Sequence, residues 1–146
     1  MKYPIGIQTF EQIRNGGFVY ADKTDLVYKL ATEGKIYFLS RPRRFGKSLL
    51  LSTLKCYFEG RKGLFKGLKI DALETEWKQY PVFHIDFNGY NFLDTDSLQQ
   101  ILTDYVAEWE GQWGRDPYRN SLGDRFAYVL RRSEERRVGK ECVLSC

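Results

Sequence analysis

The chain has 146 residues, with 23 Lys and Arg against 19 Asp and Glu, and its formal net charge at pH 7 is +4. This length permits one ordinary domain and excludes a two-domain enzyme with two full cores. An apolar share of 42% and a charged share of 29% exclude the disordered and fibrous classes, and no run approaches the roughly 18 apolar residues of a membrane helix.

The N-terminal residues Met1–Ile5 lack the apolar core of a signal peptide, so we expect a cytoplasmic protein with no membrane partner. Acidic and basic residues are mixed along the chain, and basic residues gather only at Arg41–Lys47 and Arg131–Lys140. This pattern favours an ordinary solvated surface and leaves a nucleic-acid partner open.

The first third of the chain predicts a short strand, a helix and a buried strand. The short strand is expected at 18–20. A helix is expected over 25–33, where apolar residues recur on one face and Gly34 follows. Ile36–Leu39 is an unbroken apolar run, which is typical of a strand buried on both faces of a parallel sheet.

The rest of the chain continues the alternation of strands and helices. A leucine-rich helix is expected over 47–58, and Asp71 with Glu74 forms a capping-box pattern for a short helix over 71–79. A second buried strand is expected over 82–87. Two further helices are expected, one starting at Asp94 or Asp96 and one after Ser121. The pattern predicts an α/β fold with a parallel sheet flanked by helices.

One segment, Ser40–Ser48, has the residues and the context of a phosphate-binding loop. It lies between an expected strand and an expected helix, so backbone amides of the loop and of the first helical turn can point at an anion. Gly46 lets the backbone approach a phosphate, Lys47 supplies a charge for the β- and γ-phosphates, and Ser48 supplies a hydroxyl for Mg²⁺. Arg41 stands where the general Walker A pattern has glycine.

The run Tyr37–Leu49, which reads YFLSRPRRFGKSL, resembles the signature of the bacterial AAA-ATPase-like family. Asp22–Thr24, Tyr57–Gly60 and Leu64–Leu68 fit the same family, and the resemblance extends over about residues 1–131. It implies a P-loop NTPase-type domain that binds ATP with Mg²⁺ and explains Arg41 as a family trait. The residues that it implies for nucleotide binding are Pro42, Arg43, Arg44, Phe45, Gly46, Lys47, Ser48 and Leu49, with Lys47 also the catalytic candidate.

The resemblance also implies parts that we do not find in this sequence. Full-length members resemble an ATPase-like domain followed by a PD-(D/E)XK nuclease-like domain, through which a protein or nucleic-acid partner could be bound. The acidic Walker B strand is expected soon after Arg131. We therefore expect nucleotide binding without complete hydrolysis. Asp86 is a weaker candidate for the Mg²⁺-facing carboxylate, and its alternative is a strand end that caps the next turn.

Residues 132–146 differ from the rest, because they show no apolar period and hold two of the three cysteines. From Arg132 they resemble a translated sequencing adapter. We therefore expect a truncated P-loop domain at 1–131 and a non-native tail at 132–146.

Two other functions stay open at this point. The basic loop could bind nucleic-acid phosphates without nucleotide turnover, or the chain could be an inert fragment. His84 and Cys56 are expected to be packed residues without a catalytic role.

Overall fold

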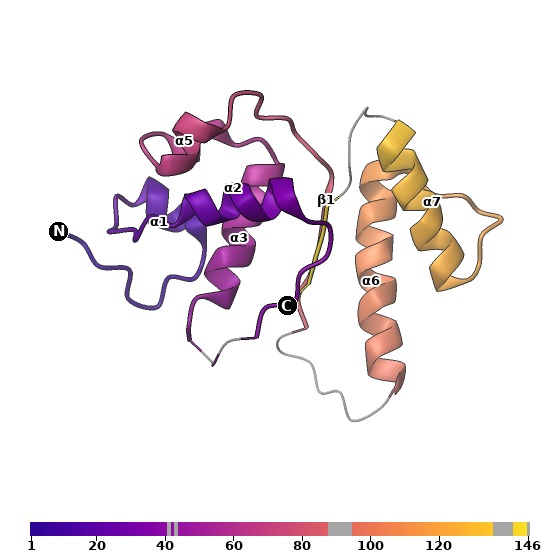
Figure 1. The fold of residues 1–146 in the computed structure, drawn as a ribbon. Helices are drawn as coiled ribbons and strands as arrows, with labels where there is room; N and C mark the ends of the chain where they lie inside the picture. Colours follow the sequence, from indigo (N-terminus) through magenta and orange to yellow (C-terminus); the bar gives the residue numbers. More distant parts are fainter. Residues whose placement is uncertain (41, 43, 88–94, 136–141, 146) are drawn as a thin grey trace.

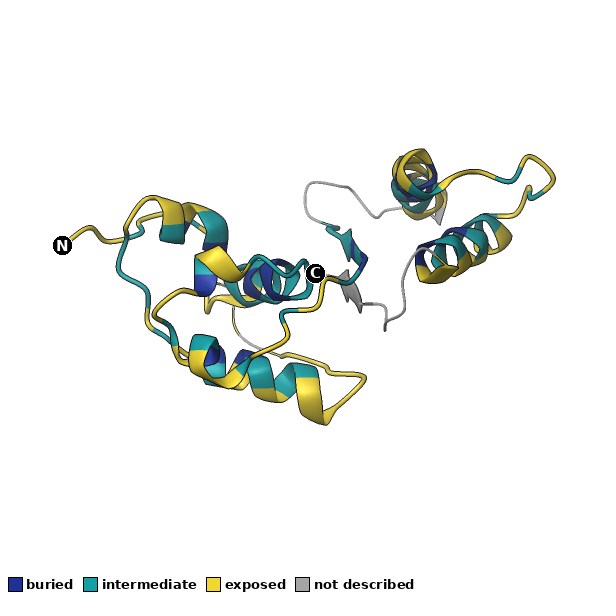
Figure 2. Ribbon diagram, turned by 90° about the horizontal axis from the view of Figure 1, so that it is seen from above, coloured by how far each residue is buried: buried dark blue, intermediate teal, exposed yellow. Residues whose placement is uncertain are grey.

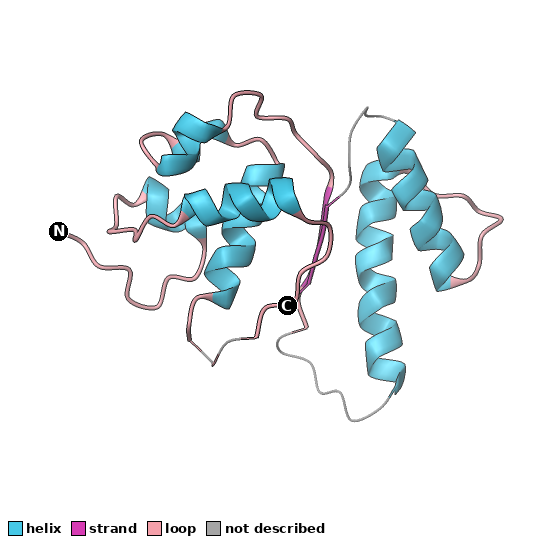
Figure 3. Cartoon of the chain, viewed as in Figure 1, coloured by secondary structure: helices cyan, strands magenta, loops and turns pink. Residues whose placement is uncertain are grey.

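The computed structural model describes residues 1–40, 42, 44–87, 95–135 and 142–145. Helices dominate these residues (Figure 3). The elements in chain order are α1 (Phe10–Asn15), α2 (Thr24–Glu33), α3 (Lys47–Phe58), α4 (Lys62–Phe65), α5 (Lys69–Leu73), β1 (Val82–Ile85), α6 (Thr95–Trp113), α7 (Leu122–Glu135) and β2 (Cys142–Ser145).

The strands β1 and β2 pair in parallel, with Val82 opposite Cys142 and Ile85 opposite Ser145. They lie between helices α1–α5 on one side and helices α6 and α7 on the other (Figures 1 and 2). The wider parallel sheet that the sequence predicted is not formed by the described residues, whose strands are this one short pair.

The first core joins the short helices α1–α5. Its buried side chains are Phe10, Val27, Cys56, Tyr57, Phe65 and Ile70. The aromatic rings make direct contacts: the centroids of Phe10 and Phe65 are 4.8 Å apart, and those of Phe65 and Trp77 are 5.2 Å apart. Five helices of 4 to 12 residues are thus held mainly by what they bury together.

The second core joins β1 to the hairpin of α6 and α7. Phe83, Val106, Trp109 and Val129 are its buried residues. Phe83 packs edge-on against Trp109, with ring centroids 4.9 Å apart. This core therefore covers the face of β1 that lies away from α1–α5.

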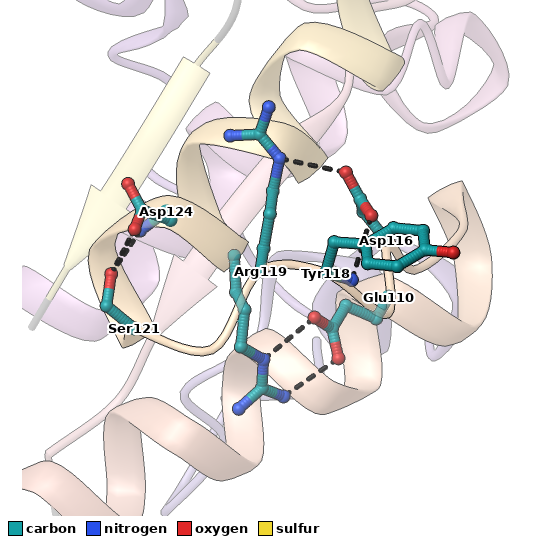
Figure 4. A network of polar contacts seen from close by, with 7 residues as sticks. Glu110, Asp116, Tyr118, Arg119, Ser121 and Asp124 are labelled. Carbon is teal, nitrogen blue, oxygen red and sulfur yellow. Dashed lines mark hydrogen bonds and ion pairs between the residues drawn. The ribbon is translucent and has the colours of Figure 1, made fainter.

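An ion pair between the half-buried Arg125 and the buried Glu110 ties α6 to α7. The Arg125 guanidinium donates to both carboxylate oxygens of Glu110, at 2.9 and 2.8 Å, and it holds the pKa of Glu110 below its usual range. Nearby, Asp116 binds the backbone amide of Tyr118 and the side chain of Arg119 (Figure 4). These contacts fix the loop between the two helices.

Several predicted helices are confirmed. The structure places α2 at Thr24–Glu33, α3 at Lys47–Phe58 and α6 at Thr95–Trp113, close to the expected ranges. The helix α7 runs to Glu135, four residues past Arg131, and the buried Ser133 donates its hydroxyl to the Leu130 carbonyl. The assignment of 132–146 as a non-native tail stays a prediction.

The strand predicted at Ile36–Leu39 is wrong. The segment forms no strand, and Ile36 and Phe38 are each 94% exposed. A buried strand needs a neighbour on each edge and helices on both faces, and the described residues provide neither here. The strand expected at 18–20 also has no ladder, although the Val19 amide donates to the Lys2 carbonyl at 2.8 Å.

The short helix predicted over 71–79 is also displaced, because α5 ends at Leu73. The Glu74 carboxylate accepts hydrogen bonds from the Tyr57 hydroxyl and from the backbone amides of Glu76 and Trp77. Trp77 has a φ of 45°. The side chain of Glu74 therefore organises a turn after α5 and does not cap a helix.

Candidate phosphate-binding loop

The candidate site lies where the loop meets the first turn of α3. Arg44, Phe45, Gly46 and Lys47 are exposed, as is Pro42, while Arg41 and Arg43 lie outside the described residues. Ser48 and Leu49 are half-buried on the first turn. An anion could therefore approach the loop and the N-terminal end of α3 directly from solvent.

The backbone turns sharply just before the helix. Arg44 and Gly46 both have left-handed backbone, with φ values of 66° and 77°. For arginine this conformation is strained by roughly 1–3 kcal/mol. Alternation of left-handed residues with ordinary ones orients successive amides toward one side of the chain, which is the backbone pattern of anion-binding nests.

The N-terminus of α3 has no acidic side chain and no side-chain cap. Gly46 occupies the N-cap position, and the first turn contains no Asp or Glu. The first intrahelical bond runs from the Leu50 amide to the Gly46 carbonyl at 2.9 Å. The earlier amides of the helix have no intrahelical acceptor, and the helix dipole adds attraction for a negative group.

The α3 helix is held from the side by residues near the N-terminus of the chain. The Phe10 amide donates to Ser52 Oγ at 2.6 Å. Burial raises the pKa of the Tyr20 hydroxyl, and a hydrogen bond with Thr53 on α3 opposes this rise. Sequence reasoning missed both links, because they join residues more than 30 positions apart.

The motif Asp22-Lys23-Thr24 has a structural role. Asp22 Oδ1 accepts from the amide and the hydroxyl of Thr24, and Asp22 Oδ2 accepts from the Lys69 amide at 2.8 Å. The buried Thr24 hydroxyl accepts from the Ile70 amide. The motif therefore joins the first turn of α2 to the start of α5, while Lys23 stays exposed.

Asp86 follows the end of β1, and its backbone is fixed by α6. Its amide donates to the Tyr105 hydroxyl at 3.0 Å, and its carbonyl accepts from the same hydroxyl at 3.1 Å. In the part of the chain that the structure describes, no group of three or more His, Cys, Asp or Glu side chains could hold a metal ion. A Mg²⁺ role for Asp86 stays a prediction.

The other candidates are packed. His84 is half-buried on β1, and its burial, followed by the charge of Lys55, lowers its pKa. Cys56 is buried in the first core, and burial raises its pKa, which disfavours the reactive thiolate. Among the described helices, none combines the length and the apolar composition of a membrane span.

Comparison with known proteins gives a family and a relative. A family model described as "Predicted AAA-ATPase" matches residues 4–144. The chain is 38% identical over 133 residues to a protein of Azotobacter chroococcum mcd 1, described as an uncharacterized protein in the vnfD 5' region. The match covers 90% of this chain and 26% of the relative, so the chain spans about a quarter of that protein. No solved structure matches.

Proposed function

The chain belongs to the predicted AAA-ATPase family, and on this premise we propose that residues 42–49 bind the polyphosphate of ATP together with Mg²⁺. The observation that carries the proposal is the start of α3. A left-handed Gly46 precedes a helix whose first turn holds Lys47 and Ser48 and lacks any acidic residue. Family membership supports a nucleotide-binding role in general. The loop and the first turn of α3 carry the basic side chain, the hydroxyl and the amides that a polyphosphate would need.

Each residue has a distinct part in the proposal. The amides of residues 43–47 would surround the β-phosphate, and the Lys47 ammonium would contact the β- and γ-phosphates. The Ser48 hydroxyl would ligate Mg²⁺, and the guanidinium groups of Arg43 and Arg44 would add charge. The first-turn position of Lys47 and Ser48 suits these parts, since their side chains start from the same helical turn whose amides bond no earlier carbonyl of the helix.

The energies required are modest. A hydrogen bond to a charged group contributes about 1.5–3 kcal/mol. A micromolar nucleotide needs a binding free energy of about −8 kcal/mol. Several charge-assisted bonds from the loop and from Lys47 would supply this even after the ordering cost of an exposed loop.

For hydrolysis, a carboxylate must in addition hold Mg²⁺, and usually another orients the attacking water. Asp86 is the weaker candidate that this sequence offers, and its alternative is a strand end that caps the next turn. If Asp86 serves this part, Asp86→Asn will slow turnover and leave nucleotide affinity nearly unchanged. Without turnover in the unmodified chain, the activity of this chain is binding.

Mg-ATP titration by calorimetry and by thermal unfolding tests the proposal. We expect Mg-ATP to raise the melting temperature of the chain, because ligand at 100 times its Kd stabilises the folded state by about 2.7 kcal/mol. Lys47→Ala should remove this shift. Lys62→Ala, which deletes an exposed lysine on α4, is the matched control and should keep it.

Two results would point elsewhere. DNA binding that weakens steeply with salt and ignores ATP would favour the basic loop as a nucleic-acid phosphate binder. The absence of any cooperative unfolding transition would favour an inert fragment.

A further inference from the structure

The first helix of the chain is capped by a residue of the phosphate-loop helix. The N-cap residue of α1, Thr9, makes no side-chain capping bond. Instead, the amide of Phe10, which begins α1, donates to Ser52 Oγ on α3 at 2.6 Å, across 42 positions of sequence. An unsatisfied amide at a helix start costs stability, so this hydroxyl does for α1 what a local cap usually does.

Ser52 is close to the candidate site but not part of it. It follows Ser48 by four residues in the continuous helix α3, so the two side chains lie on the same face, about one turn and roughly 6 Å apart along the axis. The capping hydroxyl and the proposed Mg²⁺ ligand therefore share one helix face. Movement or fraying of the first turns of α3 would therefore displace the hydroxyls of both Ser48 and Ser52.

The segment capped by Ser52 is firmly attached to the same group of helices. We call residues 9–20 the N-terminal arm. Phe10 and Ile13 of the arm are buried. Glu11 forms an ion pair with Arg61, and Arg14 donates to the carbonyls of Leu64 and Lys66 at 2.7 Å each. The arm thus contacts the middle of α3 through Phe10. It contacts residues 61–66, which follow α3, through Glu11 and Arg14.

We propose that Ser52 is a positioning residue that couples the order of the N-terminal arm to occupancy of the phosphate loop. The inference rests on the proposed function. A phosphate that accepts from the first-turn amides holds the start of α3 in its helical conformation, and the Ser52 hydroxyl is then held where the Phe10 amide needs it. Coupling is reciprocal, so an ordered arm strengthens nucleotide binding by the same factor.

Segment-resolved amide hydrogen exchange of the full chain, with and without Mg-ATP, tests the coupling. Mg-ATP should slow exchange in residues 9–20 of the unmodified protein. Ser52→Ala should lose this slowing and bind Mg-ATP about 5-fold more weakly, the lower end of ordinary coupling between sites. Ser52→Thr keeps the hydroxyl and should restore both effects.

The matched control is Thr103→Ala. It removes a helix hydroxyl on α6 that donates to the Gln99 carbonyl at 2.7 Å, and it should alter neither Mg-ATP affinity nor the exchange of the arm. A general effect of losing a helix hydroxyl would appear in this variant too.

The outcomes separate the two proposals. If the unmodified chain does not bind Mg-ATP, both proposals are overturned. If Mg-ATP binds and exchange in the arm does not change, or if Ser52→Ala keeps wild-type slowing, only the coupling is overturned. If Ser52→Ala does not fold, the unmodified chain still tests the coupling, because unchanged exchange in the arm overturns it, and Ser52→Val, which removes the hydroxyl and matches the side chain of Ser52→Thr in size, then tests the part of Ser52.

Discussion

The helices α1–α5 and the hairpin of α6 and α7 reach stability by different routes. The first group is made of short helices joined by long-range contacts, such as the bond from Phe10 to Ser52 and the pair of Glu11 and Arg61. The hairpin is made of two long helices joined by an apolar core of their own and by an ion pair of residues only 15 positions apart. The candidate phosphate loop belongs to the first group, so its geometry depends on many separate contacts.

The largest expected effect comes from the first core. Phe65 is fully buried against Phe10, Tyr57 and Trp77. Phe65→Ala should lower the free energy of unfolding by about 3–5 kcal/mol, because it removes apolar contacts and leaves a cavity. Urea unfolding measures the loss, and hydrogen exchange should place the added opening in residues 9–80.

Tyr118→Ala is the control for that variant, since Tyr118 is 91% exposed and its removal should cost under about 0.5 kcal/mol. Equal opening of α6 and α7 in Phe65→Ala would show that the two regions unfold as one unit. Helices α1–α5 would then not be an independent unit of stability.

The next effect belongs to the hairpin. Glu110→Gln leaves the half-buried guanidinium of Arg125 without its charged partner. We expect a loss of about 2–3 kcal/mol at pH 7, measured by urea unfolding, because breaking a buried pair leaves an uncompensated charge. Amide hydrogen exchange should become faster in α6 and α7 and stay unchanged in residues 9–20.

The pH dependence of this loss provides the check. The pKa of folded Glu110 lies below its ordinary value of 4.5, so the stabilisation is fully present above that value. It is lost as the pH falls through the lower pKa of the folded state. The difference between the unmodified chain and Glu110→Gln should therefore shrink in acid, and a difference that is constant down to pH 2 would contradict the assignment.

The smallest effect is expected at the run that the sequence placed in a sheet. Phe38→Ser should change the free energy of unfolding by less than about 0.5 kcal/mol, because the ring of Phe38 is almost wholly exposed. Thermal unfolding measures this. A loss of several kcal/mol would show that the ring is buried in solution.

Features set by neighbouring residues could be predicted from the sequence. The start of α3 at Lys47 and its end at Phe58 follow from Gly46 and the leucine pattern, and β1 follows from its apolar run. The exposure of Ile36–Leu39 could not be predicted, because a strand exists only where a partner strand lies beside it. The link from Ser52 to Phe10 has no local signal either. Within the candidate site, the glycine turn and the helix start were predictable, and the ligands remain predictions.

The exposed run Ile36–Leu39 also affects how the protein behaves at high concentration. Three β-favouring residues and Leu39 are exposed here without charge or proline, a composition that favours pairing between strands of identical chains. Lys35 on one side and the arginines after Ser40 on the other act as gatekeepers, since their like charges repel between molecules. Salt that screens this repulsion should favour self-association, and dilution and low salt should oppose it.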